Sequence, residues 1–328
     1  MLTQSSILVT GGTGSFGQKF VQLTLSKFNP KRVIVYSRDE MKQWDMAAKF
    51  NNDPRLRFFL GDVRDKDRLH RALNGVDYVV HAAALKIVPA AEYNPFECIK
   101  TVINGAMNVV DACIDNGIKT CIALSTDKAC NPINLYGASK LCSDKVFVAA
   151  DAYAGGHKTR FAVVRYGNVM GSRGSVIPLF RKLASAGRLP ITDVRMARFM
   201  ITLEQGVELV WQAFADTLGG EIYVRKIPSM KVVDIARTIA PEAQHETVGI
   251  RPGEKLHEMM ISVEDARNAF EYDTYFKILP QIHEWFRDPL RQSNGKPCLE
   301  GFAYSSDTNT AWMRPDELRA WVRNEYGE

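Results

Sequence analysis

The chain of 328 residues lacks the features that mark membrane, metal-binding and disulfide-rich secreted proteins. No apolar stretch is long enough to span a bilayer, and no basic segment precedes the first apolar run as it does in a signal peptide. The six cysteines form no C-x-x-C pair, and no histidine cluster accompanies them. These absences predict a cytoplasmic protein with reduced, mostly buried thiols and no bound metal.

A concentrated positive charge is also missing. Lys and Arg number 42 against 37 Asp and Glu, and the resulting net charge of +5 is spread along the chain without a basic arm. This balance suits an anionic small-molecule substrate and gives nucleic-acid binding little support. The length allows one large α/β domain that carries a smaller one.

Short apolar runs alternate with helical patterns through the first half of the chain. Strands rich in Val, Ile and Phe that alternate regularly with helices predict a doubly wound parallel sheet of the Rossmann type. The strand-like runs are "SILVTGG", "RVIVYSR", "LRFFLGD", "DYVVHAAA", "TCIALST" and "RFAVVRYGNV", and helices are expected from about Ser15 and at Met41–Phe50, Lys66–Leu73, Asn94–Asn116 and Tyr136–Ala154.

The segment "VTGGTGSFG" places three glycines at the junction of the first strand and its helix. Gly11, Gly14 and Gly17 form a G-x-x-G-x-x-G frame, which allows a tight turn and a close backbone approach to a pyrophosphate. Thr13, Ser15 and Phe16 belong to the same turn and are expected at the same ligand. A purely structural turn is the weaker interpretation, because the motif opens a β-α-β series.

Residues at the tips of the next strands indicate which dinucleotide binds. Ser37 and Arg38 end the second strand, where a hydroxyl and a guanidinium suit the 2′-phosphate of NADP. The alternative is that Arg38 is a surface charge and the following Asp39 binds the ribose of NAD. Further cofactor contacts are expected from Asp62 and Val63 at the adenine and from Ala82 and Ala83 at the ribose.

The expected organisation follows from this cofactor site. Residues 1–168 and 198–226 are predicted to form the NADP-binding Rossmann domain. After Gly171 the alternation loosens, and Pro/Gly breaks dominate beyond Pro228. Residues 169–197 and 227–328 are therefore expected to form a smaller substrate-binding domain that closes over the cofactor.

A tyrosine and a lysine lie one helical turn apart in "STDKACNPINLYGASK". A lysine ammonium favours the phenolate, so Tyr136 beside Lys140 can take a proton from an alcohol while a hydride leaves the same carbon. Thr126, at the end of the preceding strand, can bond the same substrate oxygen. The alternative is a surface tyrosine on an amphipathic helix.

These motifs resemble the extended short-chain dehydrogenases/reductases, and further segments narrow the resemblance. Nearly the whole chain is similar to the inverting UDP-N-acetylglucosamine 4,6-dehydratases, the type that opens pseudaminic acid biosynthesis. Cys130 stands where alanine is expected and is interpreted as a packing residue. The segments that carry the resemblance are "STDKACNPINLYGASK", "HAAALKIVPAAEYNP", "RYGNVMGSRGSVIP", "IRPGEKLHE" and "FAYSSDTNTAWM".

The resemblance implies a lyase reaction on UDP-N-acetylglucosamine. The C4 hydroxyl is oxidised with Tyr136 as base, water is lost across C5 and C6, and the hydride held by NADP returns to C6. Retaining relatives use an Asp-Glu pair for the elimination, whereas Lys128 follows Asp127 here. The resemblance implies Asp127 as the acid and Lys128 as the base, with inversion at C5. Neutral Lys128 beside protonated Asp127 is expected, and a simple ion pair is the alternative.

The same resemblance implies substrate contacts and a multimer. The expected substrate residues are Lys86, Asn168, Arg198, Arg251 and Glu254, with arginine suited to the UDP diphosphate. A UDP-sugar 4-epimerase shares the fold and the Tyr136/Lys140 pair but does not need Asp127 and Lys128. A non-catalytic NADP-binding regulator of the same fold typically lacks the Tyr/Lys pair. A homo-oligomer is expected.

Overall fold

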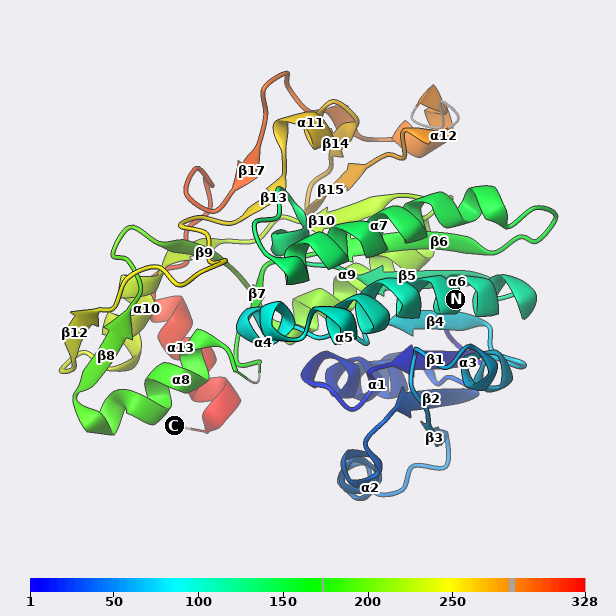
Figure 1. Cartoon of the computed structure of the whole chain (residues 1–328), viewed down its shortest axis with the longest axis horizontal. Helices are drawn as coiled ribbons and strands as arrows, with labels where there is room; N and C mark the ends of the chain where they lie inside the picture. The colour runs from blue at the N-terminus through cyan, green and yellow to red at the C-terminus, as the bar shows by residue number, and fades with distance from the viewer. Residues whose placement is uncertain (173, 283–286, 328) are drawn as a thin grey trace.

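A large, mostly parallel sheet forms the centre of the molecule (Figure 1). The computed structural model describes residues 1–172, 174–282 and 287–327. Among these residues the sheet has ten strands in the order β16-β14-β15-β10-β6-β5-β4-β1-β2-β3. The strands are β1 (Ser6–Thr10), β2 (Arg32–Ser37), β3 (Leu56–Leu60), β4 (Tyr78–His81), β5 (Thr120–Leu124), β6 (Arg160–Arg165), β10 (Ile222–Arg225), β14 (Ala269–Glu271), β15 (Tyr275–Ile278) and β16 (Lys296–Pro297).

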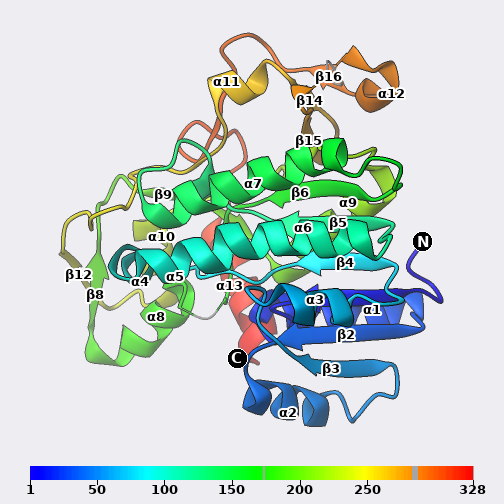
Figure 2. The ribbon, with the colours of Figure 1, turned by 45° about the vertical axis from the view of Figure 1, so that its right-hand side comes forward.

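Helices cover both faces of this sheet. Helices α3, α6 and α7 lie side by side on one face, and α1 packs against α9 on the other (Figure 2). Strands covered on both faces should be apolar throughout, and every residue of β1 and β5 is indeed buried. The helices are α1 (Ser15–Phe28), α2 (Glu40–Lys49), α3 (Lys66–Ala72), α6 (Gly105–Asp115), α7 (Leu135–Tyr153) and α9 (Leu203–Asp216).

The predicted helix at Asn94–Asn116 is interrupted. Helix α5 (Pro95–Ile99) passes through a π-helical segment, η1 (Lys100–Asn104), before α6 begins, and the short α4 (Val88–Tyr93) precedes them. Helix α6 starts where Gly105 packs closely, since a Cβ there would lie 2.8 Å from Cγ2 of Val63. The interruption thus lies beside the expected adenine contact, and π-helical turns are often found at functional sites.

A second hydrophobic cluster lies beside the central sheet. Phe180, Ile191, Met200, Ile235 and Leu318 are among its buried members. It brings together segments that precede and follow α9, because β7 and β11 both pair with β9. Its elements include α8 (Val176–Leu183), β8 (Arg188–Ile191), β9 (Ala197–Ile201), α10 (Val232–Ile239) and α13 (Pro315–Tyr326), and smaller sheets are formed with β7 (Asn168–Val169), β11 (Ser229–Lys231) and β12 (Gln244–Thr247).

The division into two domains stays a prediction. Part of the predicted substrate-binding domain, within residues 227–328, joins the large sheet. Strands β14 and β15 fall in residues 227–328, yet β15 pairs antiparallel with β10 and extends the parallel strands. Short strands of this kind carry little sequence pattern, so their place at the sheet edge is not readable from the sequence. In the described part of the chain, no helix has both the length and the apolar character needed to cross a membrane.

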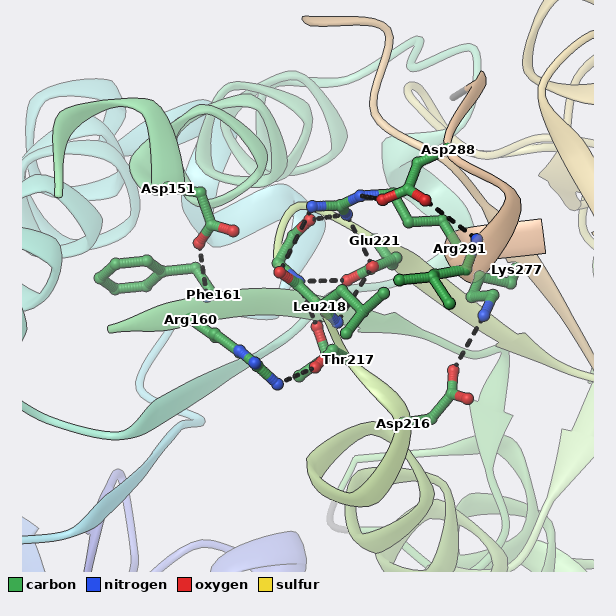
Figure 3. Close-up of polar contacts among 12 residues, drawn as sticks. Asp151, Arg160, Phe161, Asp216, Thr217, Leu218, Glu221, Lys277, Asp288 and Arg291 are labelled. Atoms are coloured by element: carbon green, nitrogen blue, oxygen red, sulfur yellow. Dashed lines mark hydrogen bonds and ion pairs between the residues drawn. The ribbon is translucent and has the colours of Figure 1, made fainter. Parts of the chain in front are cut away.

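Buried charges attach this C-terminal segment to the sheet (Figure 3). Glu221 is fully buried at the start of β10, where it accepts a hydrogen bond from Nη1 of Arg291 at 2.8 Å and another from Oγ1 of Thr217 at 2.5 Å. Nearby, Asp216 accepts from Nζ of Lys277 at 3.0 Å. Charges removed from water need such partners, so each pair holds its two segments together.

The Glu221–Arg291 pair generates a stability prediction. Glu221→Gln keeps the side-chain shape but removes the buried carboxylate charge that lies 2.8 Å from the guanidinium of Arg291, which should cost about 3–5 kcal/mol of unfolding free energy. Urea denaturation followed by circular dichroism measures this loss. The control is Asp288→Asn, because Asp288 is half-exposed and its oxygen lies 3.9 Å from Nε of Arg291; this change should cost below about 1 kcal/mol. Equal losses for the two variants would contradict the assignment.

Candidate active site

The glycine turn between β1 and α1 is shaped for close approach. Gly11 has φ of +66°, and a Cβ there would lie 2.9 Å from the backbone of Ala83. A Cβ on Gly17 would lie 2.4 Å from the carbonyl oxygen of Gly12. Only glycine fits these two positions, so the turn brings the start of α1 against the ends of β1 and β4.

The start of α1 is open to an anionic ligand. Its N-cap is Gly14, in an extended conformation, and no side chain caps the helix. Ser15 is the first helical residue, the carbonyl of Thr13 accepts from Gln18 at 3.0 Å, and Phe16 stacks on Tyr166. Amides at an uncapped helix start suit a pyrophosphate, and the residues present fit the dinucleotide that the sequence predicts.

At the tip of β2 the side chains already have partners. Arg38 is exposed and lies 3.5 Å from Oδ2 of Asp62, while the buried Ser37 hydroxyl accepts from Nε2 of Gln43 at 3.0 Å. Asp39 caps α2 by accepting from the amide of Lys42 at 3.0 Å, and its carboxylate pairs with the Lys42 ammonium. Asp39 is thus held by its own helix, whereas Arg38 projects outward.

The expected adenine and ribose residues lie along the same edge. Burial raises the pKa of Asp62, but hydrogen bonds from Arg64 outweigh it and hold that pKa below its ordinary value. Val63 is buried, and its carbonyl accepts from Nδ2 of Asn108 at 3.0 Å. The amides of Ala82 and Ala83 lie 3.2 Å from Oγ1 of Thr10. These residues therefore cluster at the ends of β1, β3 and β4.

The Tyr136/Lys140 pair occupies the first turns of α7, with both side chains buried. Burial raises the pKa of Tyr136 to about 12, although the charge of Lys128 and a hydrogen bond with Thr126 act to lower it. Nζ of Lys140 donates to the carbonyl of Leu124 at 2.6 Å, and burial lowers the pKa of Lys140 against the opposing charge of Asp144. Tyr136 is thus no surface residue.

Asp127 and Lys128 form a short turn after β5, η2 (Asp127–Ala129), and a third charged group joins them. Nζ of Lys128 lies 3.0 Å from Oδ1 of Asp127 and 3.2 Å from Oε1 of Glu258. Both carboxylates are buried, and Thr126 donates to Oδ1 of Asp127 at 2.9 Å. Glu258 was missed by sequence reasoning, although it is the last residue of "IRPGEKLHE"; its distance of more than a hundred residues along the chain concealed the contact.

The expected neutral state of Lys128 is not what this arrangement favours. Burial lowers the pKa of Lys128, but the charges of Asp127 and Glu258 outweigh burial and raise it above the ordinary lysine value. Burial and the charge of Asp127 raise the pKa of Glu258, against the opposing charge of Lys128. The sequence shows one carboxylate beside Lys128, whereas the fold places two within 3.2 Å of its Nζ, and both favour the charged ammonium.

A loop from the second half of the chain covers this group. Nδ2 of Asn134 donates to the carbonyl of Gly253 at 2.7 Å, and Nζ of Lys255 donates to the carbonyl of Cys130 at 2.6 Å. At this end of the sheet α4, β7 and β9 gather near the start of α7 (Figure 1). Cys130 is buried, which raises the pKa of its thiol to about 12, in agreement with a packing role.

The expected substrate residues divide into exposed and structural ones. Lys86 is exposed beyond β4, Asn168 is half-buried in β7, and Arg251 is exposed on the loop with Nε 3.7 Å from Glu254. Arg198 is buried, and its guanidinium donates to the carbonyls of Ala197, Leu256 and Lys255 at 2.8–2.9 Å. Arg198 therefore holds the loop in place, which differs from the expected contact with a diphosphate.

A buried arginine lies behind the site, and sequence reasoning also missed it. Arg165 is 2% exposed at the end of β6. Its Nη2 lies 3.3 Å from Asp144 on α7, and its Nη1 lies 3.1 Å from Asp265 and 2.8 Å from the carbonyl of Met260. Ser125 donates to the same oxygen of Asp144 at 2.7 Å. The neighbouring residues in "RYGNV" do not indicate these partners, which lie far from Arg165 in the sequence.

The nucleotide turn and the buried Tyr/Lys pair on a doubly wound sheet define an extended short-chain dehydrogenase/reductase. The chain belongs to the family described as polysaccharide biosynthesis protein, whose pattern matches residues 7–280.

Two curated relatives bear on the activity. A Campylobacter jejuni (serotype O:2) protein named UDP-N-acetylglucosamine 4,6-dehydratase (inverting) is 54% identical over an alignment that covers 100% of both chains. A Rickettsia conorii protein named UDP-glucose 4-epimerase is 41% identical, covering 85% of this chain and 84% of its own. The similarity to the dehydratase is thus both higher and more extensive.

Solved structures confirm the predicted fold class. Pen from Bacillus thuringiensis has a TM-score of 0.89 at 34% identity, covering 98% of this chain and 99% of its own. A dTDP-glucose 4,6-dehydratase from Streptomyces venezuelae, solved with NAD bound, has a TM-score of 0.69 at 26% identity, covering 76% of this chain and 86% of its own.

The glycine turn generates a binding prediction. In Gly17→Ala the new methyl group meets the Gly12 carbonyl, and relieving this overlap should cost about 1–3 kcal/mol. If the turn moves out of its binding shape to relieve the overlap, affinity for NADPH falls by the same free energy, roughly 5- to 150-fold. Fluorescence titration of the protein with NADPH measures the change. The matched control is Gly156→Ala, because a Cβ at Gly156 meets nothing within 4 Å. Unchanged affinity in Gly17→Ala would contradict the assignment of the glycine turn to the pyrophosphate of the cofactor.

Proposed function

We propose that the protein is a UDP-N-acetylglucosamine 4,6-dehydratase that inverts C5 and forms UDP-2-acetamido-2,6-dideoxy-β-L-arabino-hex-4-ulose. The observation that carries the proposal is the Asp127–Lys128 pair, a buried carboxylate beside a partly buried ammonium, a few residues ahead of Tyr136 and Lys140. The full-length similarity to the dehydratase supports it, and the epimerase alternative is weaker. A non-catalytic regulator would not need the buried Tyr136/Lys140 pair.

We infer that the cofactor is NADP. The glycine turn and the start of α1 would hold its pyrophosphate, and Arg38 would face a 2′-phosphate. Asp39 does not compete for the ribose, because it caps α2 and pairs with Lys42. When bound there, the cofactor would supply the hydride chemistry that the reaction needs between C4 and C6 of the sugar.

Tyr136 acts first, as the base for the C4 hydroxyl. Its raised pKa means that the phenolate needs nearby positive charge, and Lys128 supplies it in the structure. The hydroxyl of Thr126 would bind the same sugar oxygen. Lys140, fixed to the carbonyl of Leu124, would orient the cofactor ribose and the tyrosine.

Asp127 and Lys128 then carry the elimination. The C4 ketone makes the C5 hydrogen acidic, so a neutral Lys128 amine can remove it while protonated Asp127 gives its proton to the departing C6 hydroxyl, which leaves as water. In the resting ion pair, transfer of the ammonium proton to Asp127 produces both forms at once. Return of a proton to the opposite face of C5 gives the inversion.

Four of the five substrate residues expected from the sequence are retained as proposed contacts. We expect Arg251 and Lys86 at the UDP diphosphate, Glu254 at the uridine ribose and Asn168 at the sugar, while Arg198 supports the loop. We further infer a homo-oligomer, and a product that enters pseudaminic acid biosynthesis.

The direct test is incubation of the purified protein with UDP-N-acetylglucosamine and NMR of the product. A C6 methyl signal with inverted C5 configuration is expected. A C4 epimer with an intact C6 hydroxymethyl group would instead support the epimerase, and no conversion with intact cofactor binding would support the regulator.

The cofactor assignment predicts a preference that depends on Arg38. Wild-type protein should bind NADP+ more tightly than NAD+, and Arg38→Ser should remove most of this preference, because the 2′-phosphate loses its guanidinium. Calorimetric titrations with both nucleotides measure it. Activity should need no stoichiometric NADP+, since the hydride returns to the sugar. Tighter binding of NAD+ by the wild type would refute the assignment.

Lys128→Ala should separate oxidation from elimination. Tyr136, Thr126 and Lys140 remain, so reduced nicotinamide should still appear once per active site, but at a higher pH than in the wild type, because the phenolate of Tyr136 loses the charge of Lys128. Exchange of the C5 hydrogen with solvent deuterium should fall roughly 10²- to 10⁴-fold. Stopped-flow absorbance and NMR measure the two steps. The comparison variant is Tyr136→Phe, in which neither step should occur. Exchange at the wild-type rate in Lys128→Ala would show that another residue is the base.

A further inference from the structure

The contact between Glu258 and Lys128 has no assigned role in the reaction. Oε1 of Glu258 lies 3.2 Å from Nζ of Lys128, and Glu258 is 1% exposed. Its second oxygen is buried without a hydrogen-bond partner among the described residues, and so is Oδ2 of Asp127. A buried carboxylate oxygen without a donor is costly, so this arrangement calls for a functional reason.

The backbone of Glu258 is hydrogen-bonded on both sides of its residue. Its backbone amide donates a hydrogen bond to Oγ of Ser306 at 3.0 Å. Its carbonyl accepts from the amide of Ser306 at 2.8 Å and from Oγ of Ser305 at 3.3 Å. Ser306 in turn donates to the carbonyl of Ala197 at 3.0 Å. Two serines of the segment "FAYSSDTNTAWM" thus fix the backbone of Glu258, whose carboxylate lies against Lys128.

Charged groups from four segments face this contact. Asp127 lies on η2 beside Lys128, and Tyr136 lies at the start of α7. Arg198 on β9 and Lys255 on the covering loop add positive charge near Glu258. Asp127 and Glu258 therefore compete for the one ammonium of Lys128, and the protonation of either carboxylate changes how firmly the other holds it.

We propose that Glu258 is a positioning residue that sets the charge of Lys128: ionised Glu258 keeps the ammonium charged beside Tyr136 during C4 oxidation, and protonated Glu258 releases Lys128 to act as the C5 base. The inference rests on the proposed dehydratase reaction. It explains how one lysine serves two steps with opposite needs, since the phenolate of Tyr136 needs a cation nearby and C5 needs a neutral amine. The proton that leaves the C4 hydroxyl during oxidation can reside on the unpartnered oxygen of Glu258, while the ammonium proton of Lys128 goes to Asp127.

Glu258→Gln tests the proposal, because the amide has nearly the same shape as the protonated acid and carries no charge. In the pH–rate profile of C5 deuterium exchange, the rising limb reports the neutral amine of Lys128. The midpoint of this limb should move about 1–3 pH units lower, as expected when a lysine loses an opposite charge within hydrogen-bonding distance. The limb for nicotinamide reduction, which reports Tyr136, should move higher. Loss of packing alone would slow both steps without moving their limbs in opposite directions.

Two further variants complete the design. Glu258→Asp retains the charge at a longer distance, so both limbs should move in the same directions as in Glu258→Gln but less. Glu271→Gln removes a carboxylate that pairs with Lys226 and not with Lys128, so the exchange limb should stay in place. An unmoved exchange limb in Glu258→Gln, or an equal movement in Glu271→Gln, would overturn the proposal.

A readout that needs no turnover separates this proposal from the proposed function. The ¹⁵Nζ signal of Lys128, assigned by its loss in Lys128→Gln, can be titrated in the wild type and in Glu258→Gln. A lower midpoint in the variant is expected, and equal midpoints would overturn the inference even if the dehydratase activity is established. If UDP-N-acetylglucosamine is not converted but the midpoint still falls, the proposed function fails, and with it the two-step role, while the effect of Glu258 on the charge of Lys128 stands.

Discussion

The buried guanidinium of Arg165 is the constraint on which the site depends. An arginine that is 2% exposed must keep its charged partners, because breaking a buried pair by removing one side leaves an uncompensated charge. Those partners are Asp144 on α7 and Asp265 beyond β13 (Met259–Ile261), and Asp144 also accepts from Ser125 after β5. One charge thus fixes the three segments that carry Tyr136, Asp127 and Glu258 relative to one another.

Burial acts in opposite directions within this site, and the local charges decide the outcome. It raises the pKa of Tyr136 and lowers that of Lys140, so burial favours the uncharged form of both groups. Around Lys128 two carboxylates outweigh burial and keep the ammonium. The site therefore combines a neutral phenol with a stable cation, an arrangement suited to an enzyme that removes two protons in succession.

Much of this protein was predictable because its signals are local. The strand of "SILVT", the glycines at 11, 14 and 17 and the i,i+4 spacing of Tyr136 and Lys140 each depend on neighbours within one or two elements. Such patterns reflect backbone geometry and periodicity, which the sequence displays directly. Whether Asp39 binds a ribose could not be decided from the sequence, because its role as the cap of α2 depends on the three-dimensional position of the Lys42 amide.

The sequence by itself determined the doubly wound sheet, the nucleotide turn and the order of Asp127, Lys128, Tyr136 and Lys140, because these follow from hydrophobic period and short-range spacing. Only the tertiary structure decided that Glu258 reaches Lys128, that Arg198 supports a loop through backbone carbonyls, and that β14 and β15 extend the sheet. These contacts join residues far apart in the chain, and burial gives them their strength. The residues next to one partner in the sequence do not indicate the other partner. The second carboxylate that favours the charged form of Lys128 could therefore be found only in the folded protein.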